Sequence, residues 1–455
     1  MFTDATSLIR ENPHQMSYGI AVSDVDDDGD FEIIIAGFGF PNRVLKWNGR
    51  MLIDIADEDL ADADRQAIGV AAADINGDGR EEIYILNSDT FDGPKRLGDR
   101  LFMNRGLKWV DLFSLLDNEP TANLMAGRSV ACVDRDGDGI YGFFVANYGG
   151  PMRLYELNNR GLVKDMAAQA GVNHVAGGRS LVSLPLVSTR MDIFAGNERG
   201  PNFLFYNRGD GTFEESAERF GLSDSLENVR GIAVGDFNGD GRFDVVYGNW
   251  EGPHRMFIRT EAGPFRNAAP PEMALPSRVR TVIAADFDND GYEELFFNNI
   301  GEPNRLFAFR DGRWTRVNLG AAGEPYGFGT GAAVGDFNND GRLELLIAHG
   351  ESNLQPLTLY QPLPNLCHWL RIKPLTRYGA PARGAVVRLV GGRRVQIRAI
   401  CAGSGYLCQM EPVAHFGLGP EPESELRVEV TWPDGLMRSM PIPEIDQLYV
   451  VEYPA

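Results

Sequence analysis

One acidic pattern, which occurs six times, contains the residues of this sequence best suited to hold a metal ion. It reads Asp-x-Asp/Asn-x-Asp-Gly, and its copies begin at Asp24, Asp74, Asp134, Asp236, Asp286 and Asp336. Ca²⁺ prefers about six to eight oxygen ligands from carboxylates and carbonyls. Positions one, three, five and nine offer side-chain oxygens, position seven offers a backbone carbonyl, and glycine at position six permits a sharp turn. The pattern therefore predicts loops that wrap around calcium.

Five of the six loops have a complete set of predicted ligands. The side-chain ligands are Asp24, Asp26, Asp28 and Glu32; Asp74, Asn76, Asp78 and Glu82; Asp236, Asn238, Asp240 and Asp244; Asp286, Asp288, Asp290 and Glu294; and Asp336, Asn338, Asp340 and Glu344. The carbonyls at position seven belong to Asp30, Arg80, Arg242, Tyr292 and Arg342. The third loop has Asp134, Asp136 and Asp138, but Gly142 stands where the last acid should be. We therefore expect about five Ca²⁺ ions and a sixth site that is weak or empty.

Other interpretations of the loops are less satisfactory. An EF-hand requires Glu at position twelve and flanking helices, whereas position twelve here holds Ile35, Ile85, Val145, Tyr247, Phe297 and Ile347. Clusters of Asp, Asn and Gly also form ordinary solvated turns, but five complete copies in one register are a poor match to that interpretation. Mg²⁺ rarely accepts a cage made wholly of protein oxygens. Calcium is thus the cation that the sequence favours.

The spacing of the loops predicts a structural repeat of about 50 residues. Successive copies start 50, 60, 102, 50 and 50 residues apart. The gap of 102 covers two periods, so we place a degenerate copy at Leu184, where Leu186 and Ser188 replace ligands and Asp192 remains. Each unit has four short apolar runs bounded by turn residues, which indicates four strands. A solenoid is disfavoured because its atypical repeats should be terminal. We therefore predict an all-β, seven-bladed β-propeller.

The propeller is predicted to span residues 1–365, and a small β domain is predicted to follow over residues 366–455. Runs at 386–390, 426–431 and 448–451 are typical of strands in this second part. The seventh blade has only three strand-like runs, whereas residues 2–6 resemble the missing outer strand. A closed ring removes exposed sheet edges. We therefore expect residues 2–6 to close blade 7 by pairing with residues 357–362.

The composition is that of an acidic globular protein. The chain has 455 residues, with 64 Asp and Glu against 43 Lys and Arg, which gives a net charge of −21. Nucleic-acid binding requires a basic surface, so we expect no such partner. No apolar run approaches the roughly 18 residues of a membrane-spanning helix, and residues 1–5 do not resemble a signal peptide. Cys401 and Cys408 flank a turn, and whether they form a disulfide stays open.

At the acidic loops the chain resembles the FG-GAP/VCBS repeat proteins, whose integrin-like propellers hold Ca²⁺ in such loops. The second part is similar to the ASPIC/UnbV domain in its segments 368–372, 403–407, 415–419 and 432–435. The combination resembles the cartilage acidic protein family. This resemblance implies the fold, calcium binding and an extracellular or periplasmic location, and it implies no particular reaction.

The face opposite the calcium loops is the predicted place for a partner. Its turns carry aromatic and acidic residues suited to contacts with protein or sugar: Phe38, Phe40, Tyr148, Glu198, Trp250, Glu251 and Glu302. The first strands of four blades also begin with arginines on this face: Arg128, Arg179, Arg230 and Arg280. These arginines could hold an anion, or they could pair with acids such as Glu198 and Glu251. Both interpretations stay open at this point.

Binding is the function that the sequence favours. We expect a calcium-stabilised propeller that acts as an extracellular-type binding or adhesion module for an unknown protein or glycan. The alternative is a polysaccharide- or glycan-processing enzyme built on a propeller. An enzyme needs converging groups of tuned pKa, and the sequence has no nucleophile motif, cofactor loop or paired histidines. Ser404, Tyr406 and His415 are expected to be structural, and we predict no catalytic residue.

Overall fold

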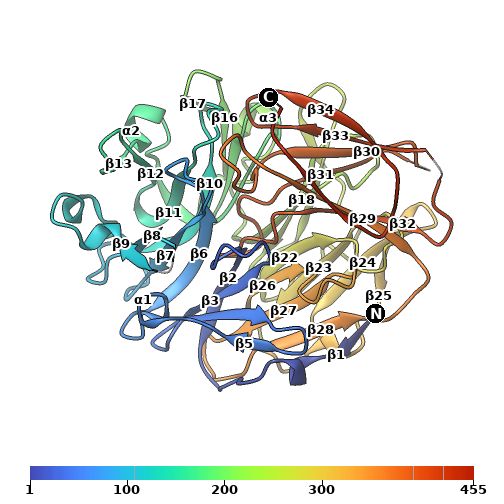
Figure 1. The fold of residues 1–455 in the computed structure, drawn as a ribbon, viewed down its shortest axis with the longest axis horizontal. Helices are drawn as coiled ribbons and strands as arrows, with labels where there is room; N and C mark the ends of the chain where they lie inside the picture. The colour runs from blue at the N-terminus through green and yellow to red at the C-terminus, as the bar shows by residue number, and fades with distance from the viewer. Residues whose placement is uncertain (107, 393, 424, 455) are drawn as a thin grey trace.

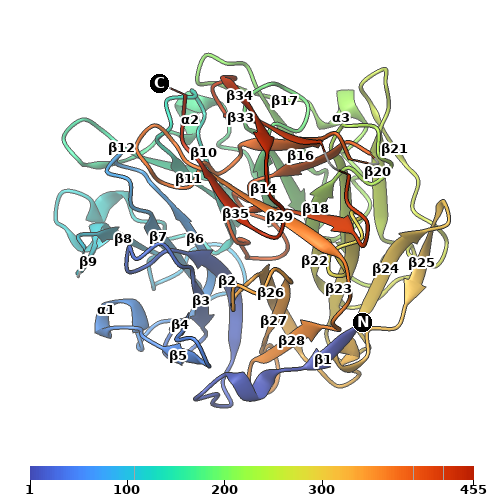
Figure 2. The same cartoon turned by 45° about the vertical axis from the view of Figure 1, so that its right-hand side comes forward.

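The structure, a computed structural model, describes residues 1–106, 108–392, 394–423 and 425–454. Strands dominate it (Figure 1, Figure 2), and the predicted all-β fold is confirmed. Its helices are single turns: α1 (Glu58–Ala61), α2 (Ala167–Ala170) and α3 (Ala217–Phe220). Short 3₁₀ turns are η1 (Thr6–Leu8), η2 (Leu112–Ser114), η3 (Glu119–Thr121) and η4 (Ala321–Gly323). None of the helices within these ranges has the length and apolar character needed to cross a lipid bilayer.

The strands of the first part form antiparallel sheets arranged around a common centre, as in a propeller (Figure 1). From the inner strand outward, the units are β2 (Ser17–Ser23), β3 (Glu32–Gly37), β4 (Arg43–Trp47) and β5 (Leu52–Asp54); β6 (Ala67–Ala73), β7 (Glu82–Asn87), β8 (Arg100–Asn104) and β9 (Trp109–Asp111); β10 (Gly127–Val133), β11 (Gly142–Pro151), β12 (Arg153–Leu157) and β13 (Val163–Asp165); β14 (Val175–Leu184), β15 (Asp192–Asn197), β16 (Phe203–Asn207) and β17 (Phe213–Glu215); β18 (Val229–Gly235), β19 (Asp244–Asn249), β20 (Arg255–Arg259) and β21 (Phe265–Asn267); β22 (Val279–Ala285), β23 (Glu294–Asn299), β24 (Arg305–Arg310) and β25 (Arg313–Val317); and β26 (Gly329–Gly335), β27 (Glu344–His349), β28 (Thr358–Pro362) and β1 (Phe2–Asp4). Two of these units join into one eight-stranded sheet because β11 also pairs with β14. We number the units as blades 1 to 7 in the order given; the count of seven remains our interpretation.

Burial explains the sequences of these strands. The second strand of most blades is buried along its whole length, and Ile33, Ile34 and Ile35 of β3 are fully buried. β-Branched residues suit strands that pack on both faces. The inner strands crowd around the centre and need small residues: a Cβ at Gly19 would lie 2.8 Å from Gly69 Cα and closer still to the carbonyl of Leu407. A segment from far along the chain therefore occupies the centre of the ring.

The N-terminal strand lies in the sheet of blade 7. β1 pairs antiparallel with β28, in a register that runs from Phe2↔Pro362 to Asp4↔Tyr360. Phe2 is 3% exposed, and its ring meets the ring of Phe287 edge-on at 4.9 Å between centroids. Blade 7 is thus made from both ends of the ring sequence, and β28 has a hydrogen-bonded neighbour on each side.

The C-terminal segment forms two further sheets, with the orders β32–β29–β35 and β31–β30–β33–β34. Their strands are β29 (His368–Pro374), β30 (Val386–Val390), β31 (Gln396–Ala399), β32 (Ala414–Gly419), β33 (Leu426–Thr431), β34 (Met437–Ile442) and β35 (Leu448–Val451). Leu370, Val387 and Trp432 belong to the apolar core between them. The segment, orange to red, lies over one end of the ring (Figure 1, Figure 2). We propose that residues 366–455 form a domain of their own.

Residues 401–410, between β31 and β32, enter the centre of the ring, and we call them the central plug. Backbone hydrogen bonds join the plug to inner strands of three blades: Gln409 N to Ile20 O (2.8 Å), Cys132 N to Ala402 O (2.8 Å) and Ile232 N to Gly405 O (2.9 Å). Tyr406 and Leu407 belong to the same apolar core as the neighbouring blades. Cys401 and Cys408 are free thiols, so they form no disulfide with each other.

A buried histidine replaces an asparagine that recurs at one place in the blades. Three asparagines accept a hydrogen bond from the backbone at the end of the second strand: Asn42 from Gly37 N (2.9 Å), Asn202 from Asn197 N (2.9 Å) and Asn304 from Asn299 N (2.8 Å). In blade 5 His254 Nδ1 accepts from Asn249 N (3.0 Å), and its Nε2 faces Ser277 Oγ (3.0 Å). Burial, aided by Arg305 and Arg255, lowers the pKa of His254 to about 3.

His254 is expected to make folding stability fall between pH 6.5 and 5. Its pKa is depressed in the folded state, so only the unfolded chain binds a proton in this window, and stability is lost as pH falls at roughly 1.4 kcal/mol per pH unit. His254→Asn keeps an acceptor for Asn249 N and removes this part of the pH dependence. Chemical denaturation in calcium-saturated buffer at pH 7.5 and 5.5 measures it, with the exposed His14→Asn as control. Equal pH dependence in both variants would contradict the expectation.

Candidate functional site

The acidic loops all connect the first and second strands of their blades, so they gather at one end of the ring. In three of them, three carboxylate oxygens lie within 4.8 Å of one another: Asp24, Asp26 and Glu32; Asp134, Asp136 and Asp138; and Asp286, Asp288 and Glu294. The loops that begin at Asp74, Asp236 and Asp336 have asparagine at position three and so bring together fewer carboxylates. Three acids of loop 1, of loop 3 and of loop 6 thus come close enough together to face a single ion.

Backbone hydrogen bonds hold each loop in shape. In loops 1, 3, 5, 6 and 7 the first aspartate accepts from the backbone of positions five and six; Asp24, for example, accepts from Asp28 N (3.1 Å) and Gly29 N (2.9 Å). The last acid accepts from the backbone of position two, as Glu32 does from Val25 N (2.7 Å). The same bonds recur at Asp286 and Glu294. These contacts fix the carboxylates before any ligand binds, which favours metal binding.

A side-chain cation lies among the carboxylates of the first loop. Lys46 Nζ is 2.5 Å from Asp26 Oδ2, 2.6 Å from Asp28 Oδ2 and 3.2 Å from Glu32 Oε1. In loop 6, Asp288 Oδ1 is buried without a hydrogen-bond partner among the described residues. Both observations fit a cation held by side-chain oxygens.

Asparagine replaces a carboxylate at position three of the second, fifth and seventh loops. Its amide donates to acids of the same loop: Asn76 Nδ2 is 3.2 Å from Asp78 Oδ2 and 3.0 Å from Glu82 Oε1. The amide oxygen at the other end of the side chain is a suitable calcium ligand once the carboxamide turns. These three loops therefore offer three carboxylates and one amide oxygen each.

Burial and crowding raise the pKa of the acids at the loop ends. Burial, reinforced by neighbouring carboxylates, raises the pKa of Glu82 to about 9 and that of Asp286 to about 8. The same causes raise the pKa of Glu32 to about 7. Carboxylates that converge in a buried place repel one another, and a bound cation removes this penalty.

The third and fourth loops differ from the others. In the third loop the backbone N–H groups of Gly137 and Gly139 donate to the Asp134 carboxylate. The last position of this loop is Gly142, which offers no carboxylate. In the fourth loop Leu184 and Leu186 are buried. The remaining acid, Asp192, is satisfied by the backbone: Val187 N (2.8 Å), Ser188 N (2.8 Å) and Asn207 N (2.8 Å) donate to it. The only carboxylate of the fourth loop is thus occupied by hydrogen bonds from the backbone.

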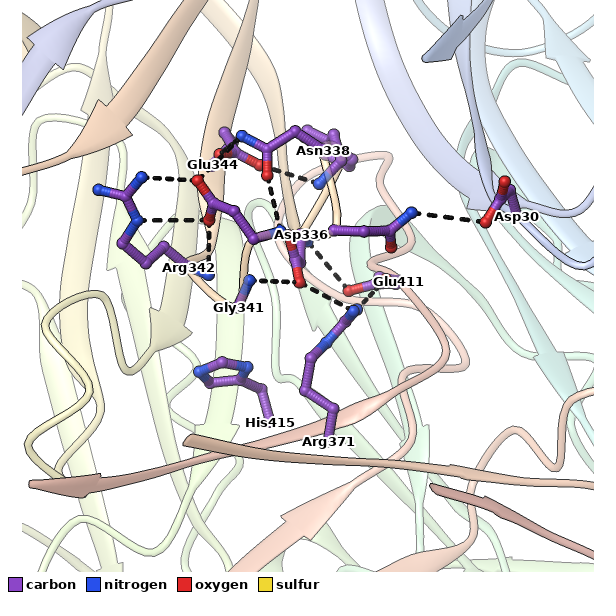
Figure 3. A network of polar contacts seen from close by, with 12 residues as sticks. Asp30, Asp336, Asn338, Gly341, Arg342, Glu344, Arg371, Glu411 and His415 are labelled. Atoms are coloured by element: carbon purple, nitrogen blue, oxygen red, sulfur yellow. Dashed lines mark hydrogen bonds and ion pairs between the residues drawn. The ribbon is translucent and has the colours of Figure 1, made fainter. Parts of the chain in front are cut away.

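The C-terminal sheets contact the acidic loops directly (Figure 3). Arg371 of β29 donates to Asp336 Oδ2 of loop 7 at 3.0 Å and also pairs with Glu411. At loop 6, Gly417 N of β32 donates to Asp286 Oδ2 at 3.0 Å. In Figure 3 Arg371 points up toward Asp336 from the strand below it. The first aspartates of two loops, Asp286 and Asp336, therefore also contact the C-terminal segment.

A buried ion pair that the sequence analysis missed connects loop 2 to the same segment. Arg383 is fully buried; its Nε lies 2.5 Å from Glu81 Oε1, and its Nη2 donates to Val22 O at 2.9 Å. Glu81 stands at position eight of its loop, as Glu293 does in loop 6, where it lies 3.4 Å from Arg398. The glutamate at position eight could have indicated an ion pair from the sequence alone, because that position is apolar or aromatic in the other acidic loops.

The four predicted arginines lie together at the opposite end of the ring, around a cavity of about 500 Å³. Arg179, Arg230 and Arg280 are 4%, 4% and 7% exposed. Trp250, predicted for the partner face, lines the cavity, whereas Tyr148 is not among its lining residues; Arg179 lies 4.7 Å above the Tyr148 ring. The remaining lining residues are Tyr18, Phe38, Ile68, Ser88, Asp89, Thr90, Phe91, Glu351 and Tyr406. We call this space the arginine cavity.

Acids neutralise part of the charge of this cavity. Glu198 pairs with Arg179 (2.6 Å) and with Arg230 (3.3 Å), as one of the two interpretations of the sequence expected. Arg280 pairs instead with Glu351 at 2.5 Å. The other acid considered, Glu251, pairs with the exposed Arg278 (3.0 Å) outside the cavity.

The central plug contributes a residue to the arginine cavity. Tyr406 lines it and is 4% exposed, and the guanidinium of Arg280 lies 5.7 Å from its ring centroid. Burial raises the pKa of the Tyr406 phenol, but the surrounding arginines, first Arg280 and then Arg179, outweigh burial and hold it below its ordinary value. The sequence analysis assigned Tyr406 a structural role only, because nothing in a linear pattern shows the path of the plug.

Family models agree with both parts of the structure. The FG-GAP-like repeat model matches residues 24–85, 189–247, 236–297 and 286–347, and the ASPIC and UnbV model matches residues 376–455. Two solved structures share the fold. A BBS1N structure in complex with ARL6DN has a TM-score of 0.51 at 11% identity and covers 80% of this chain and 98% of its own. The BP39L lectin from Burkholderia pseudomallei has a TM-score of 0.51 at 13% identity and covers 77% of this chain and 99% of its own.

The fold and loops define an FG-GAP repeat protein with a C-terminal ASPIC/UnbV segment. The chain belongs to the cartilage acidic protein family: it is 46% identical to cartilage acidic protein 1 of Xenopus tropicalis over 500 aligned positions, and 46% identical to that of Homo sapiens over 507. The alignments cover all of this chain and 77% and 75% of the two relatives.

Proposed function

We propose that this chain is a calcium-stabilised binding module of the extracellular type, which recognises a protein or glycan with the face opposite its acidic loops. The observation that supports the calcium assignment is the convergence of carboxylates, with the Lys46 ammonium seated in loop 1 among the exposed Asp26 and Asp28 and the buried Glu32. An ammonium group at that place supports the proposal that this loop accommodates a cation. The match of the FG-GAP-like repeat model to the acidic loops and the 46% identity to cartilage acidic protein 1 support the same proposal.

Calcium in these loops would be structural. The loops that begin at Asp24, Asp74, Asp236, Asp286 and Asp336 would each hold one ion, the third loop would bind weakly, and the fourth would bind none. A bound ion joins the ends of the first and second strands and neutralises acids that otherwise repel. Because Asp286 and Asp336 also contact the C-terminal segment, the ions would in addition fix that segment on the ring.

The metal content of the purified chain tests this assignment. We expect about five calcium ions per chain by elemental analysis after equilibration with calcium and removal of free ion. The double variant Asp286→Asn/Asp288→Asn should lose one ion, since both side chains belong to one loop. Asp311→Asn, an exposed aspartate of the same sheet, is the matched control. Two or fewer ions in the saturated wild-type protein would overturn the assignment.

We infer that the partner contacts the rim of the arginine cavity. Trp250 and Phe91 line this cavity, and Phe91 is 58% exposed. Exposed aromatic rings beside arginines are typical of binding surfaces. We assign no catalytic residue, because the cavity's titratable groups are chiefly arginines engaged with Glu198 and Glu351. A screen of immobilised glycans and extracellular proteins, with and without calcium, is the direct search for the partner.

A further inference from the structure

We propose that the arginine cavity binds a small ligand through an oxyanion group, of the carboxylate, sulfate or phosphate type. This proposal names the ligand class of the binding face described above and rests on that proposed function. It does not depend on the occupancy of the acidic loops, which lie at the other end of the ring.

The first argument is charge. Four arginines, Arg128, Arg179, Arg230 and Arg280, line the cavity. Two carboxylates pair with them, Glu198 and Glu351, so two positive charges are left over (four minus two). Asp89 also lines the cavity, but its carboxylate accepts from Arg96 at 3.2 Å. The chain has a net charge of −21, so solubility does not require a basic cavity. Such a cavity attracts anions.

The second argument is unused hydrogen-bonding capacity. Arg230 and Arg280 are both more than nine-tenths buried. Their Nε atoms are buried too and have no hydrogen-bond acceptor among the described residues. The Nε of Arg128 is likewise without an acceptor, and its Nη2 donates only to the carbonyls of Thr90 (3.2 Å) and Phe91. Buried donors without acceptors cost free energy. The buried Nε atoms do not themselves face the cavity, so an oxyanion there would bind the Nη groups of the same guanidinium ions and supply acceptors with the matching charge.

The third argument is preorganisation. Aromatic rings hold the guanidinium groups in place: Arg280 lies 4.3 Å from the ring centroid of Trp250, and Arg179 lies 5.1 Å from that of Phe91. A planar guanidinium fixed in this way binds two oxygens of a carboxylate, sulfate or phosphate side by side. Groups that are already in position lose little entropy on binding.

The size of the cavity limits the ligand. Its volume of about 500 Å³ lies in the usual range for small-molecule sites and is too small for a folded partner. The aromatic rings of Tyr18, Phe38 and Trp250 also line it and offer flat surfaces beside the arginines. A compact ligand with one acidic group and an apolar or sugar-like face fits these features. Such a ligand could be free or could be the end of a longer chain.

Isothermal titration of the full calcium-loaded chain at low ionic strength tests the proposal. The probes are sodium sulfate, sodium glucuronate and, as the neutral counterpart, glucose. We expect one saturable site per chain for at least one anion, with a Kd below about 1 mM, and none for glucose. Binding of sulfate alone would assign a tetrahedral oxyanion, and binding of glucuronate alone would assign a carboxylate on a sugar. Absence of saturable binding by both anions to the folded protein would overturn the proposal.

Two variants separate the cavity from general charge effects. Arg128→Gln removes an arginine that has no carboxylate partner among the described residues, so none of their acids is left unpaired, and it should weaken anion binding at least about tenfold. Arg278→Gln, an exposed arginine of the same face, should bind like the wild type. Equal affinity in the two variants would overturn the proposal. Melting temperature and calcium content, measured on the same samples, show whether each variant is folded and whether the loops are loaded, so failure of the calcium assignment is seen separately.

Discussion

Removal of calcium should lower the melting temperature of this chain by more than about 10 °C. A ligand at 100-fold its Kd stabilises the folded state by roughly 2.7 kcal/mol per site, so five independent sites contribute about 14 kcal/mol. That sum is comparable to the whole stability of a typical protein, about 5–15 kcal/mol. In the metal-free chain the acids of each loop also face one another without a counter-ion, and burial raises their pKa, as at Glu82 and Asp286.

Calorimetry before and after dialysis against EDTA measures this effect. Dialysis continues until elemental analysis finds no calcium, which rules out slow release as an explanation for a small shift. Restored calcium should restore the transition, whereas magnesium at the same concentration should not, since it rarely accepts such a protein cage. An unchanged melt in protein shown to be metal-free would refute a stabilising role of the ions.

Loss of the N-terminal strand should open blade 7. A chain without residues 1–8 lacks β1, exposes the outer edge of β28 and uncovers the apolar surface that Phe2 now buries. Deletion of a buried phenylalanine side chain alone costs about 3–5 kcal/mol, and an unpaired strand edge favours aggregation. We therefore expect a lower melting temperature together with concentration-dependent association.

Two point variants refine this experiment. Phe2→Ala should account for much of the loss, because Phe2 packs against Phe287 and contacts the core of blades 6 and 7. Thr3→Ala lies on the exposed side of the same strand and should melt close to the wild type. Light scattering measures the association state of the truncated chain and the two point variants, and calorimetry measures their melting temperatures. A truncated chain that melts like the full one and stays monomeric would show that β1 is dispensable.

Local patterns made most of the ring predictable. Predicted ligands such as Asp24 and Glu32 are only eight positions apart, so their spacing alone indicates that they belong to one loop. The register of the repeats likewise placed Arg128 and Arg230 at equivalent points of different blades, and the structure has them in one cavity. In a ring of repeated units, residues at the same position of each repeat lie at the same height and face. Their closeness can therefore be predicted from the repeat period alone.

Long-range contacts were beyond the reach of these patterns. Lys46 lies among the loop 1 acids, but no other blade has a lysine at that place, so no repeated signal exists. Arg383 meets Glu81 across a sequence separation of 302 residues. The course of the central plug depends on how the C-terminal sheets sit on the ring, and the position of Tyr406 in the arginine cavity depends on that course.

The central plug has a consequence for the order in which the molecule folds. Residues 401–410 bond to inner strands that begin as early as β2, and β1 must find β28 near the other end of the ring. Contacts of such separation are slow to form, because the chain between them must first be closed into a loop. A chain emerging from the ribosome can therefore pair the strands within each blade early. The ring can reach its final form only after the residues of the plug have been made.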